Sequence, residues 1–355
     1  MLRWLDIIFY IICAILILIN LITFFKNKDS RFNKLTFLVI SFILIMLVAT
    51  RTERGGGPDY KDYYNYFYFG TRGIEKEIGY ALLNKIVYYI FGDFNIFMII
   101  VGICIVGGRI IYIYKYSPVV ILSLLIYYTG NYLTLDFDVF RQGIALSIIL
   151  VFSIKYIEKG DVNKFIISVL CATSFHLSAF IFLIAYYVRK IEFKVRTYII
   201  ILFSSLIIGI TNLVSIAIKI ANIIPSARLQ SKYEQYFSGT GISGLGIGFI
   251  TDFILVIFIL YFIYKGNFKN NLNVKLFLLG FIGECLLIRY PSGRFMLYFT
   301  FSKVILYPLI LTKFKHLFIK YSYILFIIAQ SLVKFYISYN SATNAIWLYE
   351  SFLFK

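Results

Sequence analysis

Long apolar stretches recur along the chain from Trp4 to Leu348, with short polar segments between them. Their usual length of about 17–25 residues is what a helix needs to cross a hydrocarbon core of about 30 Å. The pattern therefore predicts an all-α fold: a polytopic transmembrane helical bundle of about 10–12 membrane segments, forming a single domain over residues 1–355. The predicted segments are 4–25, 35–50, 94–114, 118–134, one that begins at Arg141, 165–188, 197–220, 249–264, 276–288, 295–312 and 321–337.

Composition supports a membrane protein. Hydrophobic residues make up 61% of the chain and the mean hydropathy is +0.84, whereas a soluble domain is nearer half apolar. The first stretch has one flanking Arg3 and lacks an A-x-A cleavage site, so we expect a retained span. The four cysteines lie in apolar stretches without metal-ligand spacing, and we expect free packing residues.

Basic residues are sorted by type between the two sides of the membrane. Predicted cytoplasmic loops hold 15 of the 23 lysines, whereas the opposite side holds 8 of the 12 arginines. Arg109 is assigned to the cytoplasmic end of its segment, together with Lys115. Lysine anchors loops at an anionic inner leaflet, but arginine on the far side works against the positive-inside rule. Its planar fork suits diphosphate or carboxylate. The net charge of +18 is dispersed among short loops, which argues against nucleic-acid binding.

Two outer-face loops are expected, at 51–93 and 221–248. The first contains a tyrosine-rich run, and its residues 77–92 have the spacing of a helix lying at the outer interface. The second contains Arg228 and Tyr233. Aromatic faces with interleaved carboxylates suit sugar rings, but an interfacial aromatic belt has the same composition.

Segment 165–188 is flanked by basic clusters at both ends, so a single crossing would leave one cluster outside. Two half-helices of about 11 residues, each reaching about 17 Å, would instead rise and return. The break in such a re-entrant hairpin would fall at Thr173–His176, lining a polar cavity. One ordinary span that violates the charge rule is the alternative.

His176 is one of two histidines and lies in an apolar segment, where polar groups are costly and tend to be functional. It could act as a general base, or it could only bond a backbone carbonyl. Arg141 could pair with Asp136 or Asp138 at the edge of the same cavity, or serve as an interfacial anchor. The second histidine, His316, is expected to be solvated.

Arg289 and Arg294 bracket a short turn that is either a clamp for an anionic head group or a pair of interfacial anchors. Glu284 is expected in an internal ion pair, and Asp252 at an interfacial helix start. The sequence contains no P-loop, no G-x-G-x-x-G before a helix and no metal-type cluster of histidine, cysteine and aspartate.

Several motifs together resemble the EpsG family of Wzy-like bacterial polysaccharide and O-antigen polymerases. They are Phe140-Arg141-Gln142-Gly143-Ile144-Ala145, Ser174-Phe175-His176-Leu177-Ser178-Ala179, Gly57-Pro58-Asp59-Tyr60 with Tyr63, Glu77-Ile78-Gly79-Tyr80, and Arg294 before Tyr298. Pro58 stands where the family often has a small polar residue. The resemblance runs from about residue 50 to residue 300.

The resemblance implies a glycosyltransferase of the bacterial inner membrane that joins oligosaccharide repeat units carried on undecaprenyl diphosphate, on the outer face and without metal or cofactor. Expected partners are these lipid-linked oligosaccharides, the lipid bilayer, a chain-length regulator and a flippase. The expected catalytic residues are His176, Arg141 and Asp59. The expected substrate-binding residues are Arg51, Tyr60, Glu77, Tyr80, Gln142, Arg228, Tyr233, Arg289 and Arg294.

Three other functions fit parts of the sequence. A transporter or flippase of lipid-linked sugars would also use broken helices, although no matching halves are evident. A membrane O-acyltransferase also uses a membrane histidine, but needs cytoplasmic access to its donor. An O-antigen ligase shares the chemistry and differs in its acceptor.

Overall fold

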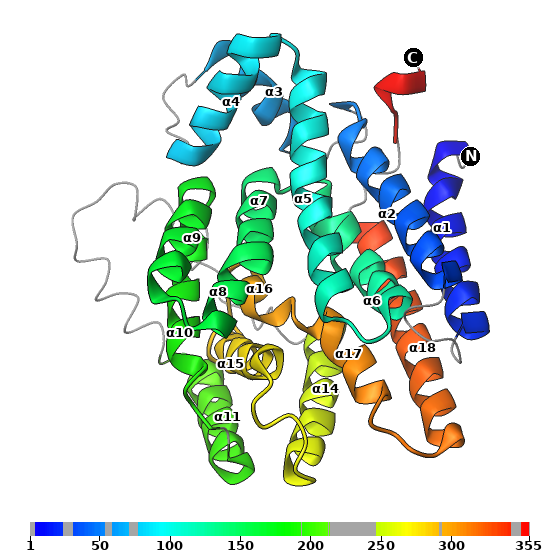
Figure 1. The fold of residues 1–355 in the computed structure, drawn as a ribbon, viewed down its shortest axis with the longest axis vertical. Helices are drawn as coiled ribbons and strands as arrows, with labels where there is room; N and C mark the ends of the chain where they lie inside the picture. The colour runs from blue at the N-terminus through cyan, green and yellow to red at the C-terminus, as the bar shows by residue number, and fades with distance from the viewer. Residues whose placement is uncertain are drawn as a thin grey trace. The chain divides into compact units, whose positions relative to one another are not determined.

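The computed structural model describes residues 4–23, 31–53, 59–70, 77–192, 194–211, 213, 246–290, 293–341 and 349–354. These residues are mostly helical and contain no β-strand. One isolated antiparallel bridge joins Arg51 to Ser351. The ribbon in Figure 1 follows the helices along the chain. The predicted all-α helical bundle is confirmed.

The chain divides into two compact units, residues 1–183 with 304–355, and residues 184–303. The first contains α1 (Trp4–Thr23), α2 (Arg31–Ala49), α3 (Tyr60–Phe69), α4 (Ile78–Phe91), α5 (Phe94–Tyr116), α6 (Val120–Tyr127), the π-helix η2 (Tyr128–Asp136), α7 (Phe140–Ile148), the π-helix η3 (Ile149–Ser153), α8 (Ile154–Lys159), α9 (Val162–Phe175), nearly all of the 3-10 helix η4 (Leu177–Ile184) and of α17 (Lys303–Leu311), α18 (Leu317–Ser341) and η6 (Phe352–Phe354). The second contains α10 (Ala185–Val188), α11 (Val195–Ile210), α14 (Ile247–Tyr264), α15 (Leu272–Leu286) and α16 (Gly293–Thr300).

Many of these helices have the length and apolarity of membrane spans. Those long enough to cross a bilayer are Arg31–Ala49, Phe94–Tyr116, Phe140–Lys159, Ile247–Tyr264 and Leu317–Asn340, and α16 with α17 would make a sixth. Shorter apolar helices, among them Ile7–Ile22 and Val195–Ile210, bring the described part of the chain close to the predicted number of segments.

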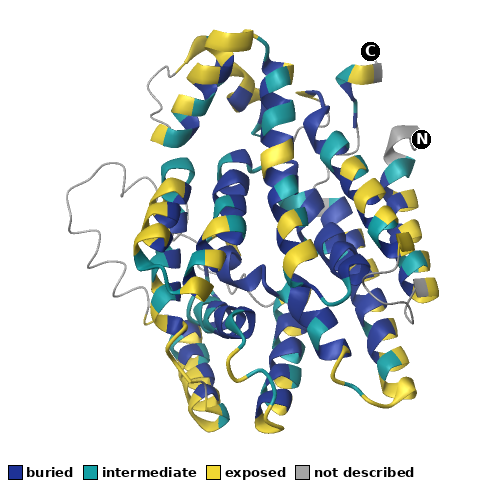
Figure 2. Cartoon of the chain, in the orientation of Figure 1, coloured by how far each residue is buried: buried dark blue, intermediate teal, exposed yellow. Residues whose placement is uncertain are grey.

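The pattern of burial is that of a protein surrounded by lipid. Outward-facing side chains of α2 such as Leu38 and Phe42 are more than 60% exposed, a degree of apolar exposure that soluble monomers avoid over large patches. Figure 2 shows exposed residues along the outer faces of the helices and buried residues between them. Because lipid gives no hydrophobic drive between helices, close packing depends on small residues. Gly102 of α5 is one, since a Cβ there would lie 2.8 Å from Cα of Ala49 in α2.

The hairpin predicted for 165–188, with its break near His176, is confirmed, and its re-entry from one side of the membrane stays a prediction. α9 ends at Phe175, His176 has an extended backbone (φ −153°, ψ 118°), and η4 begins at Leu177. The rings of Phe165 and Phe182 lie 6.3 Å apart, although a continuous helix would separate these residues by about 25 Å. The chain therefore turns back on itself at His176.

Two elements differ from the prediction. The tyrosine-rich run forms a helix, α3, with Tyr60, Tyr63 and Phe67 buried on one face at helical spacing. The predicted span 295–312 is interrupted between Thr300 and Lys303. The helix predicted at 77–92 is present as α4, and its place at the outer interface stays a prediction. The four cysteines are free, as expected.

Candidate functional site

The site of interest in the first unit lies where α4 and α7 begin. Glu77 immediately precedes α4, and Arg141 is the second residue of α7. Nη1 of Arg141 donates to Oε2 of Glu77 at 2.5 Å, with 25% and 9% of the two side chains exposed. The pair joins residues 64 positions apart, so the fold alone brings them together.

The pairing of Arg141 with Asp136 or Asp138 is wrong. Asp136 binds Arg109 in the interior, and Asp138 accepts a hydrogen bond from the backbone N–H of Asp59 at 3.1 Å. Both aspartates are close to Arg141 in sequence, but the chain between them and α7 turns their carboxylates elsewhere. Proximity in sequence suggested the wrong partner.

Burial and neighbouring charges act in opposite directions on the pKa of Glu77. Burial alone would raise the pKa of this carboxyl, but the Arg141 charge, hydrogen bonds and His176 lower it, and the net pKa lies below its usual range. Glu77 is therefore ionised at neutral pH. The guanidinium and carboxylate form a charge-assisted hydrogen bond.

An aromatic wall, formed by Tyr63 and Tyr66 of α3, Tyr80 of α4 and Phe140 of α7, stands beside Arg141. The Tyr63 ring stacks on Phe140 with centroids 4.2 Å apart, and Tyr80 lies 5.7 Å from Tyr63 and 5.6 Å from Tyr66. Burial raises the pKa of Tyr63, against the opposing effect of the Arg141 charge. Its hydroxyl therefore keeps its proton.

His176 lies at the tip of the α9–η4 hairpin, half-buried, with Nδ1 2.6 Å from Oγ of Ser178. In its protonated form His176 contributes to lowering the pKa of Glu77, so the two groups are within electrostatic range. Gly79 packs against this tip: a Cβ at Gly79 would overlap Oγ of Ser174. The first turn of α4 thus rests on the hairpin, and this contact brings Glu77, Arg141 and His176 into one region.

Asp59, the third expected catalytic residue, is at the N-terminus of α3 and half-buried. Its carboxylate makes no capping hydrogen bond to the helix, and its charge acts on Tyr63. Asp59 therefore lies near the aromatic wall and within reach of the same region.

Arg51, expected to bind substrate, lies in the interior and is fully buried. Its guanidinium carbon is 5.0 Å from the centroid of the Phe137 ring and 4.6 Å from that of Phe140, and Nη1 donates to the carbonyl of Val48 at 2.6 Å. The hydroxyl of Tyr60 donates to the Arg51 carbonyl at 3.4 Å. Both residues therefore pack behind the wall. Substrate binding by these two residues stays a prediction, and this geometry favours a structural role.

A buried ionic network lies deeper in the first unit. Arg109 and Asp136, each 1% exposed, are joined at 3.1 Å, and the hydroxyl of Tyr127 donates to the other Asp136 oxygen. Arg109 also donates to Oγ of Ser147 at 2.5 Å and to the Gly143 carbonyl at 2.8 Å. The assignment of Arg109 to the cytoplasmic end is wrong. The sequence does contain a signal for this interior position: Arg109 lies within an apolar run, and charged residues in such runs normally have partners inside the protein.

The other expected binding residues are scattered. Tyr80 and Gln142 are buried in the first unit. Arg289 and Arg294 belong to the second unit, where Nε of Arg289 donates to the Ile210 carbonyl at 2.9 Å and Arg294 is exposed at the start of α16. Arg228 and Tyr233 lie outside the described residues.

The second unit contains an ion pair of its own. Asp252, expected at an interface, is instead buried, and its Oδ2 accepts from Lys303 at 2.8 Å. Glu284 lies within electrostatic range of the same lysine, consistent with the internal ionic role expected for it.

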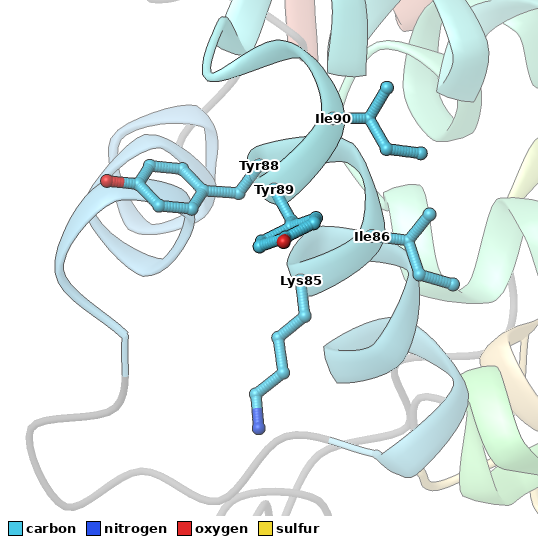
Figure 3. Close-up of a pocket in the computed structure, with 5 residues that line it drawn as sticks. All are labelled: Lys85, Ile86, Tyr88, Tyr89 and Ile90. Atoms are coloured by element: carbon cyan, nitrogen blue, oxygen red, sulfur yellow. The ribbon is translucent and has the colours of Figure 1, made fainter.

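A shallow hollow of about 510 Å³ lies on α4, lined by Lys85, Ile86, Tyr88, Tyr89 and Ile90. Figure 3 shows these side chains projecting from the helix. The hollow includes none of the expected site residues, and at 1.5 Å per residue it begins about 12 Å along the helix from Glu77. Its apolar lining and the 91% exposure of Tyr89 fit a surface that meets lipid.

Together the fold and site define a multi-pass helical membrane protein in which an arginine–glutamate pair at two helix starts lies within electrostatic range of a hairpin histidine. The chain belongs to the EpsG family, whose pattern matches residues 34–351. Comparison with curated proteins and with solved structures gives no match. The family membership expected from the short motifs is confirmed and covers nearly the whole chain.

Proposed function

We propose that the protein is a Wzy-like polysaccharide polymerase acting on oligosaccharide units linked to undecaprenyl diphosphate. Membership of the EpsG family implies a function of this kind. In the proposed reaction, the bond between the anomeric carbon of the donor sugar and its phosphate oxygen breaks. A hydroxyl of the acceptor sugar forms the new glycosidic bond, its proton passes to the enzyme, and undecaprenyl diphosphate leaves.

The observation that carries the proposal is the convergence of Arg141, Glu77 and His176. Arg141 would bind the diphosphate and stabilise its charge as it leaves, because a guanidinium fork matches phosphate oxygens. The N-terminus of α7 adds a favourable field for an anion. Neutral His176 would accept the proton of the acceptor hydroxyl, which is the task of a general base near neutral pH.

The aromatic wall offers faces on which sugar rings could stack. Tyr66, at its half-buried edge, is the member best placed to meet a substrate, whereas Tyr63 and Tyr80 are fully packed. Asp59 is the alternative base, because it lies beside the same wall. Arg51, Tyr60 and Gln142 are left out of the proposed contact surface, since their side chains are buried.

The proposed setting is the outer face of the bacterial inner membrane, where lipid-linked repeat units would be the substrates and a flippase and a chain-length regulator would be partners. The reaction would need no metal or cofactor, because the arginine supplies the positive charge that the leaving diphosphate requires.

A transporter of lipid-linked sugars is the second candidate. The broken hairpin at His176 favours it, because transporters build substrate sites from discontinuous helices at membrane depth. The two candidates differ in where single repeat units accumulate when the protein is lost. Loss of a polymerase leaves single repeat units on the carrier at the outer side, whereas loss of a flippase leaves them inside.

The test is the length of the polysaccharide in a strain that carries only the variant protein. His176→Ala and Arg141→Lys should each leave the protein in the membrane and reduce the product to single units, because the first removes the base and the second removes the fork geometry. The matched control is His316→Ala, at an exposed position before α18, which should leave chain length unchanged. Chains of normal length with both site variants would exclude the proposed mechanism.

A further inference from the structure

Glu77 occupies the place at which the proposed function puts a substrate anion. Arg141 lies in the first turn of α7, where the helix dipole disfavours a cation and favours an anion. The carboxylate of Glu77 supplies that negative charge at 2.5 Å. A phosphate group bound to Arg141 would need the same guanidinium edge, so the two anions compete.

The guanidinium of Arg141 has hydrogen-bonding capacity that Glu77 does not use. The contact to Glu77 uses Nη1, while Nε is buried without a hydrogen-bond partner among the described residues. A quarter of the side chain is exposed. Once Glu77 has moved away, a diphosphate could bind two donors of the fork together, and bidentate binding is stronger than a single bond.

Glu77 has a second position available. It is the residue that precedes α4, yet its side chain makes no hydrogen bond to the amides of that helix. The first N–H groups of a helix have no partner within the helix, and a carboxylate is favoured there. A rotation of the side chain would therefore move the carboxylate from Arg141 to the beginning of its own helix. Gly79 fixes that turn against the hairpin that bears His176.

We propose that Glu77 is a positioning residue that gates the anion site: it holds Arg141 while the site is empty, and the diphosphate of the lipid-linked donor displaces it. The inference rests on the proposed function. The displaced carboxylate moves toward the start of α4, on the side of His176, and there stabilises the imidazolium that forms when His176 takes the acceptor proton. Donor binding would thus prepare the base for its proton.

The experiment measures binding of radiolabelled geranylgeranyl diphosphate to the full-length protein in nanodiscs of neutral lipid. Glu77→Gln should bind this probe about tenfold more tightly than the unaltered chain, because a competing charge-assisted hydrogen bond is weakened by about 1.4 kcal/mol or more. Polymerisation by the same variant should show a lower KM and a lower kcat. A purely structural Glu77 would give weaker binding and a higher KM instead.

Glu158→Gln is the matched control, since Glu158 is also a carboxylate paired with a cation, Lys115 at 3.8 Å, outside the site. Its binding and kinetics should not change. Glu77→Asp is the second variant: aspartate is a preferred residue before a helix, so the protein should fold, but the shorter side chain should release Arg141 and also tighten binding. Binding that is unchanged or weaker in Glu77→Asp would overturn the gate.

Arg141→Gln separates failure of the gate from failure of the proposed function. If Arg141→Gln abolishes binding of the probe while the Glu77 variants fail to tighten it, the gate alone is wrong. If Arg141→Gln binds the probe as well as the unaltered chain does, the anion site itself is wrong and the proposed function loses its main support.

Discussion

The buried pair of Arg109 and Asp136 allows a quantitative prediction about stability. Replacing Asp136 by Asn keeps the shape of the side chain and removes its charge, leaving Arg109 charged at 1% exposure. Breaking a buried pair in this way typically costs about 3–5 kcal/mol. Arg109 keeps bonds to the Ile105 and Gly143 carbonyls and to Ser147, so we expect the lower end, about 3 kcal/mol.

The assay is unfolding in mixed micelles by increasing SDS, followed by circular dichroism. The double variant Arg109→Met with Asp136→Leu should recover most of the lost free energy of unfolding, because apolar residues can replace a buried pair at little cost. The exposed pair of Lys115 and Glu158 is the control, and Glu158→Gln should cost less than about 1 kcal/mol. A loss below about 1 kcal/mol for Asp136→Asn, or a double variant with a lower free energy of unfolding than Asp136→Asn, would refute the reasoning.

Three further predictions concern α4. Gly79→Ala should lower the free energy of unfolding by about 1–3 kcal/mol, because the added methyl group would overlap Ser174. Gly107→Ala is the control and should not destabilise the protein, because Gly107 has open space around it. Equal effects of the two substitutions would contradict the close packing at Gly79. The pKa of Glu77 is lowered, so its contribution to stability should be present above its usual pKa and be lost as the pH falls through the lower folded value. The unfolding free energies of the unaltered chain and Glu77→Gln should therefore converge only below about pH 4.3, and convergence at higher pH would contradict the shift. Tyr89→Trp should add tryptophan fluorescence that brominated lipids quench, and no quenching of the added fluorescence would place this face of α4 away from the bilayer.

Helical periodicity and segment length were sufficient to predict most of the architecture. Polar backbone in lipid must bond within its own segment, so long apolar runs have few structures open to them. The hairpin at His176 followed from charges on both sides of one apolar stretch, a signal that depends only on sequence. The helix α3 was missed because its tyrosines resemble an aromatic belt, although the buried positions Tyr60, Tyr63 and Phe67 have helical spacing.

The sequence by itself determined the membrane class and the family, and it selected Arg141 and His176 as candidate site residues, because each of these rests on local composition or short motifs. Only the tertiary structure decided the partners of the charges: Glu77 for Arg141 across 64 residues, Arg109 for Asp136, and an interior place for Arg51. The physical reason is that a buried charge must find its counter-charge in space, and helix packing brings together residues that the chain keeps far apart.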